Sequence, residues 1–209
     1  MFKIKTLLKV VLCTNMVFMR SFASHTIRCT NIMRHAIIFD NKMPSLYLHE
    51  SFHVDDKHKG SVYSIEHIFP RSHLSLHHSN DMHNVIKTIN SLNVNRSNYK
   101  FVEDIDNDKN WIKLDFDNYV NHKRKLFIPN KCSRGFISRA ILYMCNEYNY
   151  KPTIVISKDI LLKWFFEHPP TIYEKYHNEI VRKMQSKNNI FIANYNKKKA
   201  YFAKLIESL

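Results

Sequence analysis

The chain has 209 residues, 44% of them hydrophobic, which is enough to fold as one domain with a buried core. Its 32 Lys and Arg residues against 18 Asp and Glu residues give a formal net charge of +14, which favours a polyanionic partner, although a Lys-rich coding bias explains the same excess. Four cysteines without CxxC or Cys–His zinc spacing exclude the common zinc modules.

The N-terminal stretch has the composition of a targeting leader. Residues 1–39 contain no Asp or Glu; residues 1–9 are basic, residues 10–19 are apolar, and Ser21, Phe22 and Ala23 form a small-x-small cleavage signal. The apolar run is too short to span a bilayer. We expect a cleavable leader over residues 1–23 and a secreted protein without stable membrane association. A mitochondrial presequence and an uncleaved N-terminus are the alternatives, because Arg20 also suits a presequence.

Residues 24–60 give weak signals. Residues 32–39 fit either a helix or a strand, and residues 41–56, which include Pro44, are typical of a loop.

The stretch from Ser61 to Phe101 is the centre of the prediction. An apolar run over residues 62–65 predicts a short strand that ends at Glu66 and His67, before the loop at Pro70. Residues 81–86 predict a second strand, and residues 87–98 a short polar helix. Two strands and a helix would then converge on one site.

This pattern suits metal-assisted hydrolysis of a phosphodiester. The carboxylate of Glu66 and the amide oxygen of Asn93 are hard oxygen ligands of the kind that divalent metals prefer. Adjacent residues of a strand point to opposite sides, so His67 would not share the ion with Glu66. An imidazole can instead take a proton from a water that attacks phosphorus.

The remaining sequence predicts a solvated acidic loop and then helices. Alternating Asp residues occur over 103–118, but the Gly and closing Glu of a calcium loop are missing.

Ser133 and Ser157 are candidate helix caps, and Thr171 with Glu174 matches a capping box. Cys145 lies on an apolar helix stripe and is predicted to be buried. The basic tail 196–209 could form a short amphipathic helix. Its lysines could add to nucleic-acid affinity, but a solvated end is the expectation.

Histidines are frequent before the second predicted strand. A zinc site built from His73, His77, His78 and His83 is conceivable, but loop histidines without cysteine favour a solvated cluster. We expect His83 to orient the core through hydrogen bonds rather than to perform chemistry.

Several sequence blocks, in order, resemble the endonuclease I family of bacterial periplasmic and secreted nucleases. Glu66–Ser72 resembles its acid-His-x-x-Pro block, Asp81–Asn84 its Asp-x-His-Asn block, and Asn93–Asn98 its Asn-x-x-Arg-Ser-Asn block. Later matches follow the same order: Phe127–Pro129, Arg134–Met144, Trp164, His168–Pro170, Glu174, Asn178, Gln185 and Asn189–Ile192. A single short motif recurs by chance, whereas ordered blocks are specific.

The resemblance implies a single-domain α+β fold in which a ββα-metal core is surrounded by helices. It implies that Glu66 and Asn93 are metal ligands and that His67 is the general base. The family often places an arginine in the loop 72–80, and this chain has none there. Arg71 or Arg96 is the expected substitute for clamping the scissile phosphate.

We therefore expect an endonuclease domain over residues 61–195 that cuts DNA, and RNA as well, with little sequence specificity and 5′-phosphate products. Its cofactor would be Mg²⁺ or another divalent cation such as Mn²⁺ or Ca²⁺, and the protein would be a monomer. A non-catalytic basic nucleic-acid-binding protein that keeps the fold is the alternative, and a histidine-rich zinc protein is a second one.

Overall fold

A computed structural model of the chain describes residues 34–38, 45–48 and 62–208. The chain divides into two compact units, Met1–Ile37 and Ile38–Leu209. The described residues of the first unit, 34–37, are helical, and the predicted leader over residues 1–23 lies outside the described residues. All elements below belong to the second unit.

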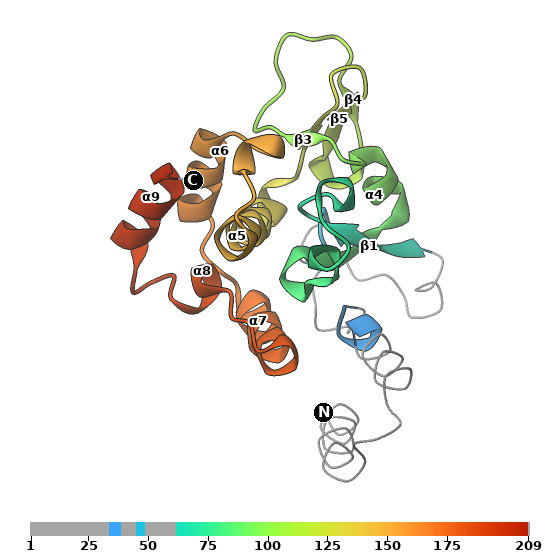
Figure 1. Cartoon of the computed structure of the whole chain (residues 1–209). Coiled ribbons are helices and arrows are strands. Elements are labelled where there is room, and N and C mark those ends of the chain that lie inside the picture. Colours follow the sequence, from blue (N-terminus) through green and yellow to red (C-terminus); the bar gives the residue numbers. More distant parts are fainter. Residues whose placement is uncertain (1–33, 39–44, 49–61, 209) are drawn as a thin grey trace. The chain divides into compact units, whose positions relative to one another are not determined.

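Two antiparallel strands and a helix form the first substructure (Figure 1). Strand β1 (Tyr63–His67) pairs with β2 (Val85–Ile89), and Glu66 lies opposite Ile86. Helix α4 (Asn90–Arg96) follows β2 directly and packs against both strands. This confirms the expected ββα core.

The second strand and the helix begin later than the sequence predicts. Asp81 caps a short 3₁₀ turn, η4 (Met82–Asn84), by accepting a 2.9 Å hydrogen bond from the backbone N–H of His83, so β2 starts only at Val85. Strand β2 pairs with β1 as far as Ile89, so α4 begins only at Asn90. Two further turns, η2 (Arg71–His73) and η3 (His78–Asn80), form the loop between the strands.

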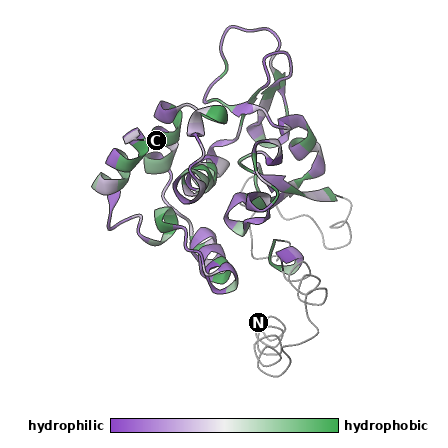
Figure 2. Ribbon diagram, viewed as in Figure 1, coloured by the Kyte–Doolittle hydropathy of each residue, from purple (hydrophilic) through white to green (hydrophobic). Residues whose placement is uncertain are grey.

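A second, four-stranded sheet follows α4. Its strand order is β3 (Lys100–Phe101), β6 (Leu126–Ile128), β5 (Tyr119–Asn121) and β4 (Ile112–Lys113). The pairing of β3 with β6 is parallel, and the other two pairings are antiparallel. The excursion between β3 and β4 is mainly hydrophilic (Figure 2), as expected of a solvated loop, and η5 (Asp115–Asp117) joins β4 to β5.

Helices make up the rest of the chain. They are α5 (Lys131–Tyr148), the turn η6 (Pro152–Ile154), α6 (Lys158–Glu167), α7 (Ile172–Gln185), α8 (Ile190–Ala193) and α9 (Lys199–Ser208). Ser157 caps α6, and Thr171 with Glu174 forms the predicted capping box of α7. The predicted cap of α5 is wrong: Asn130 accepts the bond from the N–H of Ser133, while the Ser133 hydroxyl donates to Asn130 at 2.8 Å.

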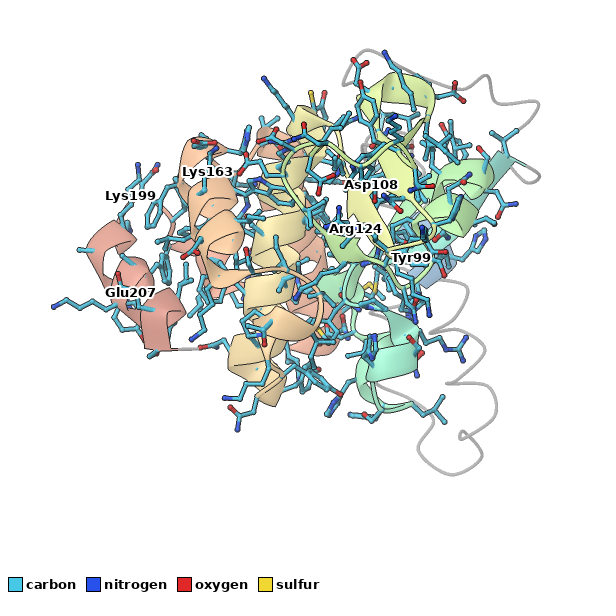
Figure 3. All side chains as sticks on the ribbon, turned by 90° about the horizontal axis from the view of Figure 1, so that it is seen from above. Tyr99, Asp108, Arg124, Lys163, Lys199 and Glu207 are labelled. Carbon is cyan, nitrogen blue, oxygen red and sulfur yellow. The ribbon has the colours of Figure 1, made fainter. Side chains whose placement is uncertain are left out.

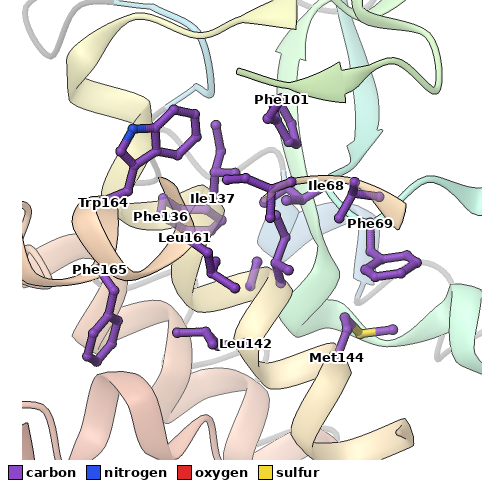
Figure 4. Close-up of a cluster of buried hydrophobic side chains, with 14 of the residues drawn as sticks. Ile68, Phe69, Phe101, Phe136, Ile137, Leu142, Met144, Leu161, Trp164 and Phe165 are labelled. Carbon is purple, nitrogen blue, oxygen red and sulfur yellow. The ribbon is translucent and has the colours of Figure 1, made fainter. Parts of the chain in front are cut away.

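The hydrophobic core surrounds α5 (Figure 4). Every residue of α5 from Ser133 to Cys145 is buried, and Trp164 and Phe165 of α6 pack against this core together with Phe101 of β3. The tail is not a solvated end, because α9 buries Phe202 and Ile206 against the core. The chain therefore has the predicted α+β class, and its sheets and helices share one hydrophobic core.

Candidate active site

Glu66 occupies a buried position near the end of β1. Its side chain is only 2% exposed, whereas its neighbour Ile65, on the other face of the strand, is 37% exposed. Its Oε1 accepts a 2.9 Å hydrogen bond from the Tyr47 hydroxyl and lies 3.3 Å from Nη1 of Arg96. Burial raises the pKa of Glu66, and the charge of Arg96 and the Tyr47 hydrogen bond oppose that rise.

Tyr47 is a site residue that the sequence analysis missed. Its ring is fully buried 5.0 Å from the ring of Phe127, and its backbone has a left-handed φ of 67°. Its N–H donates to the Ser133 hydroxyl at 2.8 Å, and its carbonyl accepts from Asn118 Nδ2 at 2.8 Å. Contacts from β6, from α5 and from Asn118, which precedes β5, therefore hold Tyr47 in place with its hydroxyl at Glu66. No motif block covers this residue.

Asn93 lies on the same side of β1 as Glu66. Its Nδ2 donates to the Ser64 hydroxyl at 2.8 Å and to the Ile65 carbonyl at 3.1 Å. Ser64 and Glu66 share one face of the strand because they are two residues apart. The Asn93 amide is thus anchored through its nitrogen, and its oxygen takes no hydrogen bond from the described residues.

His67 ends β1 on the opposite face and is half-buried. Its Nε2 lies 3.1 Å from the carbonyl oxygen of Ser79, in the loop between the strands. A carbonyl can only accept, so Nε2 carries the proton in this bond and the neutral ring has its acceptor nitrogen at Nδ1. The ring is therefore held in the tautomer that a general base requires.

The two arginines have different environments. Arg96 is 1% exposed; Nη1 donates to the His67 carbonyl at 3.1 Å, and Nη2 donates to the Ile68 carbonyl at 2.6 Å. Its guanidinium lies 4.5 Å from the ring centre of Phe101. Arg71, in η2, is exposed and makes no hydrogen bond or ion pair through its side chain with the residues that the structure describes. Arg96 thus faces Glu66 and the strand end, and Arg71 faces solvent.

The Asp-x-His-Asn block supports the loop that follows His67. The Asn84 amide bonds both the N–H and the carbonyl of Phe69, at 2.8 and 3.0 Å. Asp81 accepts hydrogen bonds from the hydroxyls of Tyr143 and Tyr148, at 2.8 and 2.6 Å. His83 is buried, with Nε2 3.1 Å from the Lys187 carbonyl, and burial lowers its pKa. His83 therefore lies within the scaffold, as its sequence context indicates.

The other histidines of the loop do not form a ligand set. His78 stacks on Tyr148 at 4.0 Å, and its Nδ1 lies 2.8 Å from the Tyr150 hydroxyl. In the part of the chain that the structure describes, no three His, Cys, Asp or Glu side chains gather around one point. Cys132 is exposed, Cys145 is buried, and both are free thiols. Glu66 and Asn93 could each offer an oxygen atom of the kind that a hard divalent cation prefers.

A strand pair and helix that carry an acid-His pair at the end of the first strand and an asparagine on the helix define a ββα core of the His-metal finger class. The chain matches the family model described as Endonuclease I over residues 4–196. It therefore belongs to the Endonuclease I family.

Two curated relatives match part of the chain. One is the "Endonuclease-1" of Buchnera aphidicola subsp. Baizongia pistaciae, 27% identical over 112 residues, which are 54% of this chain and 45% of the relative. The other is the "Extracellular deoxyribonuclease" of Aeromonas hydrophila, 32% identical over 117 residues, which are 54% of this chain and 48% of the relative. The matches thus span about half the length of these curated relatives.

Proposed function

We propose that the protein is a metal-dependent endonuclease that hydrolyses phosphodiester bonds of DNA, and of RNA, with little sequence specificity. The observation that carries this proposal is that Glu66 and His67, which are adjacent in β1, lie on opposite faces of the strand. Glu66 and Asn93 lie on one face, and His67 lies on the other with its Nε2 held by Ser79. The nuclease names of the two relatives support the same reaction.

Glu66 and Asn93 would hold the divalent metal, with Mg²⁺, Mn²⁺ and Ca²⁺ as the candidates. When bound, such an ion neutralises charge on the scissile phosphate and on the leaving oxygen. His67 takes a proton from the attacking water at Nδ1, while Nε2 keeps its own proton and donates it in the hydrogen bond to the Ser79 carbonyl. Asn93 keeps its oxygen available because Ser64 and the Ile65 carbonyl anchor its nitrogen.

The two arginines have separate roles in this proposal. Arg96 is enclosed by protein groups, so it positions the Glu66 carboxylate and balances its charge from within the core. Arg71 is the exposed guanidinium near the strand end, and it contacts the substrate phosphate. This assigns phosphate clamping to Arg71 alone.

The central experiment separates base from ligand. In His67→Ala both metal ligands remain, so DNA and metal should still bind while cleavage slows by roughly 10²- to 10⁴-fold, the usual contribution of a general base. In Glu66→Ala the ion loses its charged protein ligand, so activity and metal affinity should fall together and added Mg²⁺ should restore part of the activity. Asn93→Ala should behave as a milder form of Glu66→Ala.

The measurement is a metal titration of plasmid cleavage beside metal-binding calorimetry. His73→Ala is the matched control, because His73 is an exposed histidine of the adjacent loop. Loss of metal binding in His67→Ala but not in Glu66→Ala would reverse the roles. Wild-type protein that binds DNA without cleaving it at any divalent-metal concentration would favour the non-catalytic binding protein instead.

We also propose that the chain is exported and acts as a monomer. The leader-like composition of residues 1–23 and the word "extracellular" in the name of the Aeromonas relative support export. Among the described residues, the structure contains no helix that is both long and apolar enough to cross a bilayer. Fusing residues 1–40 to a reporter should direct its secretion, and import of the fusion into mitochondria would support the presequence alternative.

A further inference from the structure

An exposed basic turn connects β5 to β6. It consists of His122, Lys123, Arg124 and Lys125, all exposed. The Arg124 N–H donates to Asn121 Oδ1 at 3.0 Å, and Lys125 has a left-handed φ of 57°. The Asn121 side chain therefore fixes the turn, and the side chains of the turn are exposed to solvent.

The segment that leaves α4 lies beside this turn. Lys100 donates its backbone N–H to the Lys125 carbonyl at 3.0 Å, and the Tyr99 hydroxyl lies 3.2 Å from His122 Nδ1. Figure 3 shows Tyr99 next to Arg124, with Asp108 on the neighbouring excursion. The backbone of Lys100 thus lies beside the turn, at the start of β6.

Three of these cations have no acidic partner among the described residues. Arg124 pairs with Asp106 and lies 3.8 Å from Asp108, so its charge is compensated. Lys100, Lys123 and Lys125 form no ion pair with the residues that the structure describes. These three lysines are named the basic turn patch here. Uncompensated cations at one edge produce a positive potential that attracts a polyanion.

The basic turn patch is close to the candidate active site along the chain. Asn93 and Lys100 are separated by three helical steps of about 1.5 Å and four further steps of at most about 3.6 Å, so their Cα atoms lie within about 20 Å. One DNA strand covers that distance with about six phosphates. A duplex of that length therefore spans the separation between Asn93 and Lys100.

We infer that the basic turn patch binds the phosphate backbone of the DNA that is cut at Glu66, Asn93 and His67, an inference that rests on the proposed nuclease function. Lysine ammonium groups bind phosphates as point charges and read no base sequence. The patch thus lengthens the footprint on the substrate without adding sequence specificity.

A second basic cluster, Lys197–Lys199, provides the comparison. It lies at the start of α9, which packs against α6 (Figure 3 labels Lys199). Lys198 and Lys199 lie over the rings of Tyr201 and Tyr195, at 5.5 and 5.1 Å from their centres. No hydrogen bond of these lysines connects them to α4 or to the sheet in the described residues. The cluster carries the same charge at a different place.

The test measures binding of a fluorescent duplex by the full chain carrying His67→Ala, over a range of salt concentrations. Lys100→Gln, Lys123→Gln and Lys125→Gln together should make the plot of log affinity against log salt about 3 units shallower, one for each phosphate contact. The triple substitution Lys197→Gln, Lys198→Gln and Lys199→Gln, which removes the same charge, should change the slope by less than about 1 unit. If the first triple variant does not fold, Lys123→Gln alone should give a change of about 1.

Equal slopes for the two triple variants would overturn the inference, because affinity would then depend on net charge alone. Binding of the wild-type chain to phosphatidylserine vesicles that is lost in the first triple variant, with DNA binding unchanged, would also overturn it and assign the patch to a membrane surface. Failure of the wild-type chain to cleave plasmid DNA is a separate result, and it would overturn the proposed function instead.

Discussion

Glu66 combines a buried carboxylate with two donors on one oxygen. The Tyr47 hydroxyl donates to Oε1 and the Arg96 guanidinium lies 3.3 Å from it, which holds the side chain in one orientation. Metal ligands are usually oriented by such outer hydrogen bonds, and loss of one partner typically costs 10- to 100-fold in metal affinity or activity. Tyr47 is therefore a positioning residue for the proposed metal site.

Tyr47→Phe should keep the ring packing against Phe127 and remove the hydroxyl from Glu66. We expect the Mg²⁺ concentration that gives half-maximal cleavage to rise by about tenfold, which corresponds to one hydrogen bond of about 1.4 kcal/mol. Tyr143→Phe is the matched control, because it removes a buried tyrosine hydrogen bond of similar length from Asp81. Both variants should lose stability, and only Tyr47→Phe should shift the metal requirement. Equal metal curves for the two variants would refute the positioning role.

His177 is a second residue whose environment has a measurable consequence. It is buried, its Nε2 lies 3.0 Å from the Met82 carbonyl, and burial lowers its pKa from 6.5 to about 4. Between these values the unfolded chain binds a proton that the native chain does not. The free energy of unfolding should therefore be highest above pH 6.5 and fall by roughly 3 kcal/mol as the pH approaches 4.

Urea denaturation at several pH values between 4 and 7.5 would measure this loss. His177→Gln keeps a donor for the Met82 carbonyl but does not titrate, so its stability should depend less steeply on pH. Exposed His73→Gln should leave the slope unchanged. A His177→Gln curve parallel to wild type would show that other groups cause the acid sensitivity.

At the scale of elements, α5 approaches the end of α6 at Gly135. A Cβ at Gly135 would lie 2.6 Å from the Cβ and 2.7 Å from the carbonyl oxygen of His168. Arg139, one turn further, binds both carboxylate oxygens of Glu174, at 2.6 and 2.7 Å, and so joins α5 to the first turn of α7. The contact at Gly135 therefore joins α5 to the end of α6, and the Arg139–Glu174 ion pair joins α5 to α7.

Gly135→Ala tests this contact by the sign of its effect. Helix propensity alone would stabilise the variant by roughly 0.5–1 kcal/mol. The contact with His168 should reverse that and destabilise the protein by about 1–3 kcal/mol, as overpacking does. Thermal unfolding gives the answer, and a raised melting temperature would show that α5 and the His168 backbone separate easily.

The elements were predictable where local chemistry decides them. The Ser157 cap and the Thr171–Glu174 capping box depend on neighbours in the sequence, and both are confirmed. The cap of α5 was not predictable, because Ser133 is engaged by the N–H of Tyr47 and by Asn130. Tyr47 itself depends on contacts to residues far away in the chain, and such contacts leave no short pattern. The motif blocks contain the proposed ligands and the proposed base, whereas Tyr47, whose hydroxyl meets Glu66, lies outside them.

For the whole molecule, charge dominates the expected behaviour. For a chain that binds phosphates as proposed, a net charge of +14 predicts that cleavage falls steeply as salt rises, because bound Lys and Arg release counterions from DNA. Initial cleavage rates of a plasmid and of unrelated linear duplexes should decline together between about 50 and 200 mM salt. Salt-insensitive cutting at one unique sequence would contradict a nuclease that binds mainly through the backbone.

Tyr47 also bears on where a working fragment of this protein can begin. The motif blocks start at Glu66, and a fragment starting at Ser61 would contain each of them together with both strands and α4. That fragment would nevertheless lack the hydroxyl that meets Glu66, and it would lack Leu46, whose N–H donates to the Lys87 carbonyl at 2.9 Å and whose carbonyl accepts from the Thr88 hydroxyl at 2.7 Å. The smallest unit with an intact candidate site therefore includes Leu46 and Tyr47, and a fragment starting at Ser61 would leave the Glu66 carboxylate with Arg96 but without the Tyr47 hydroxyl.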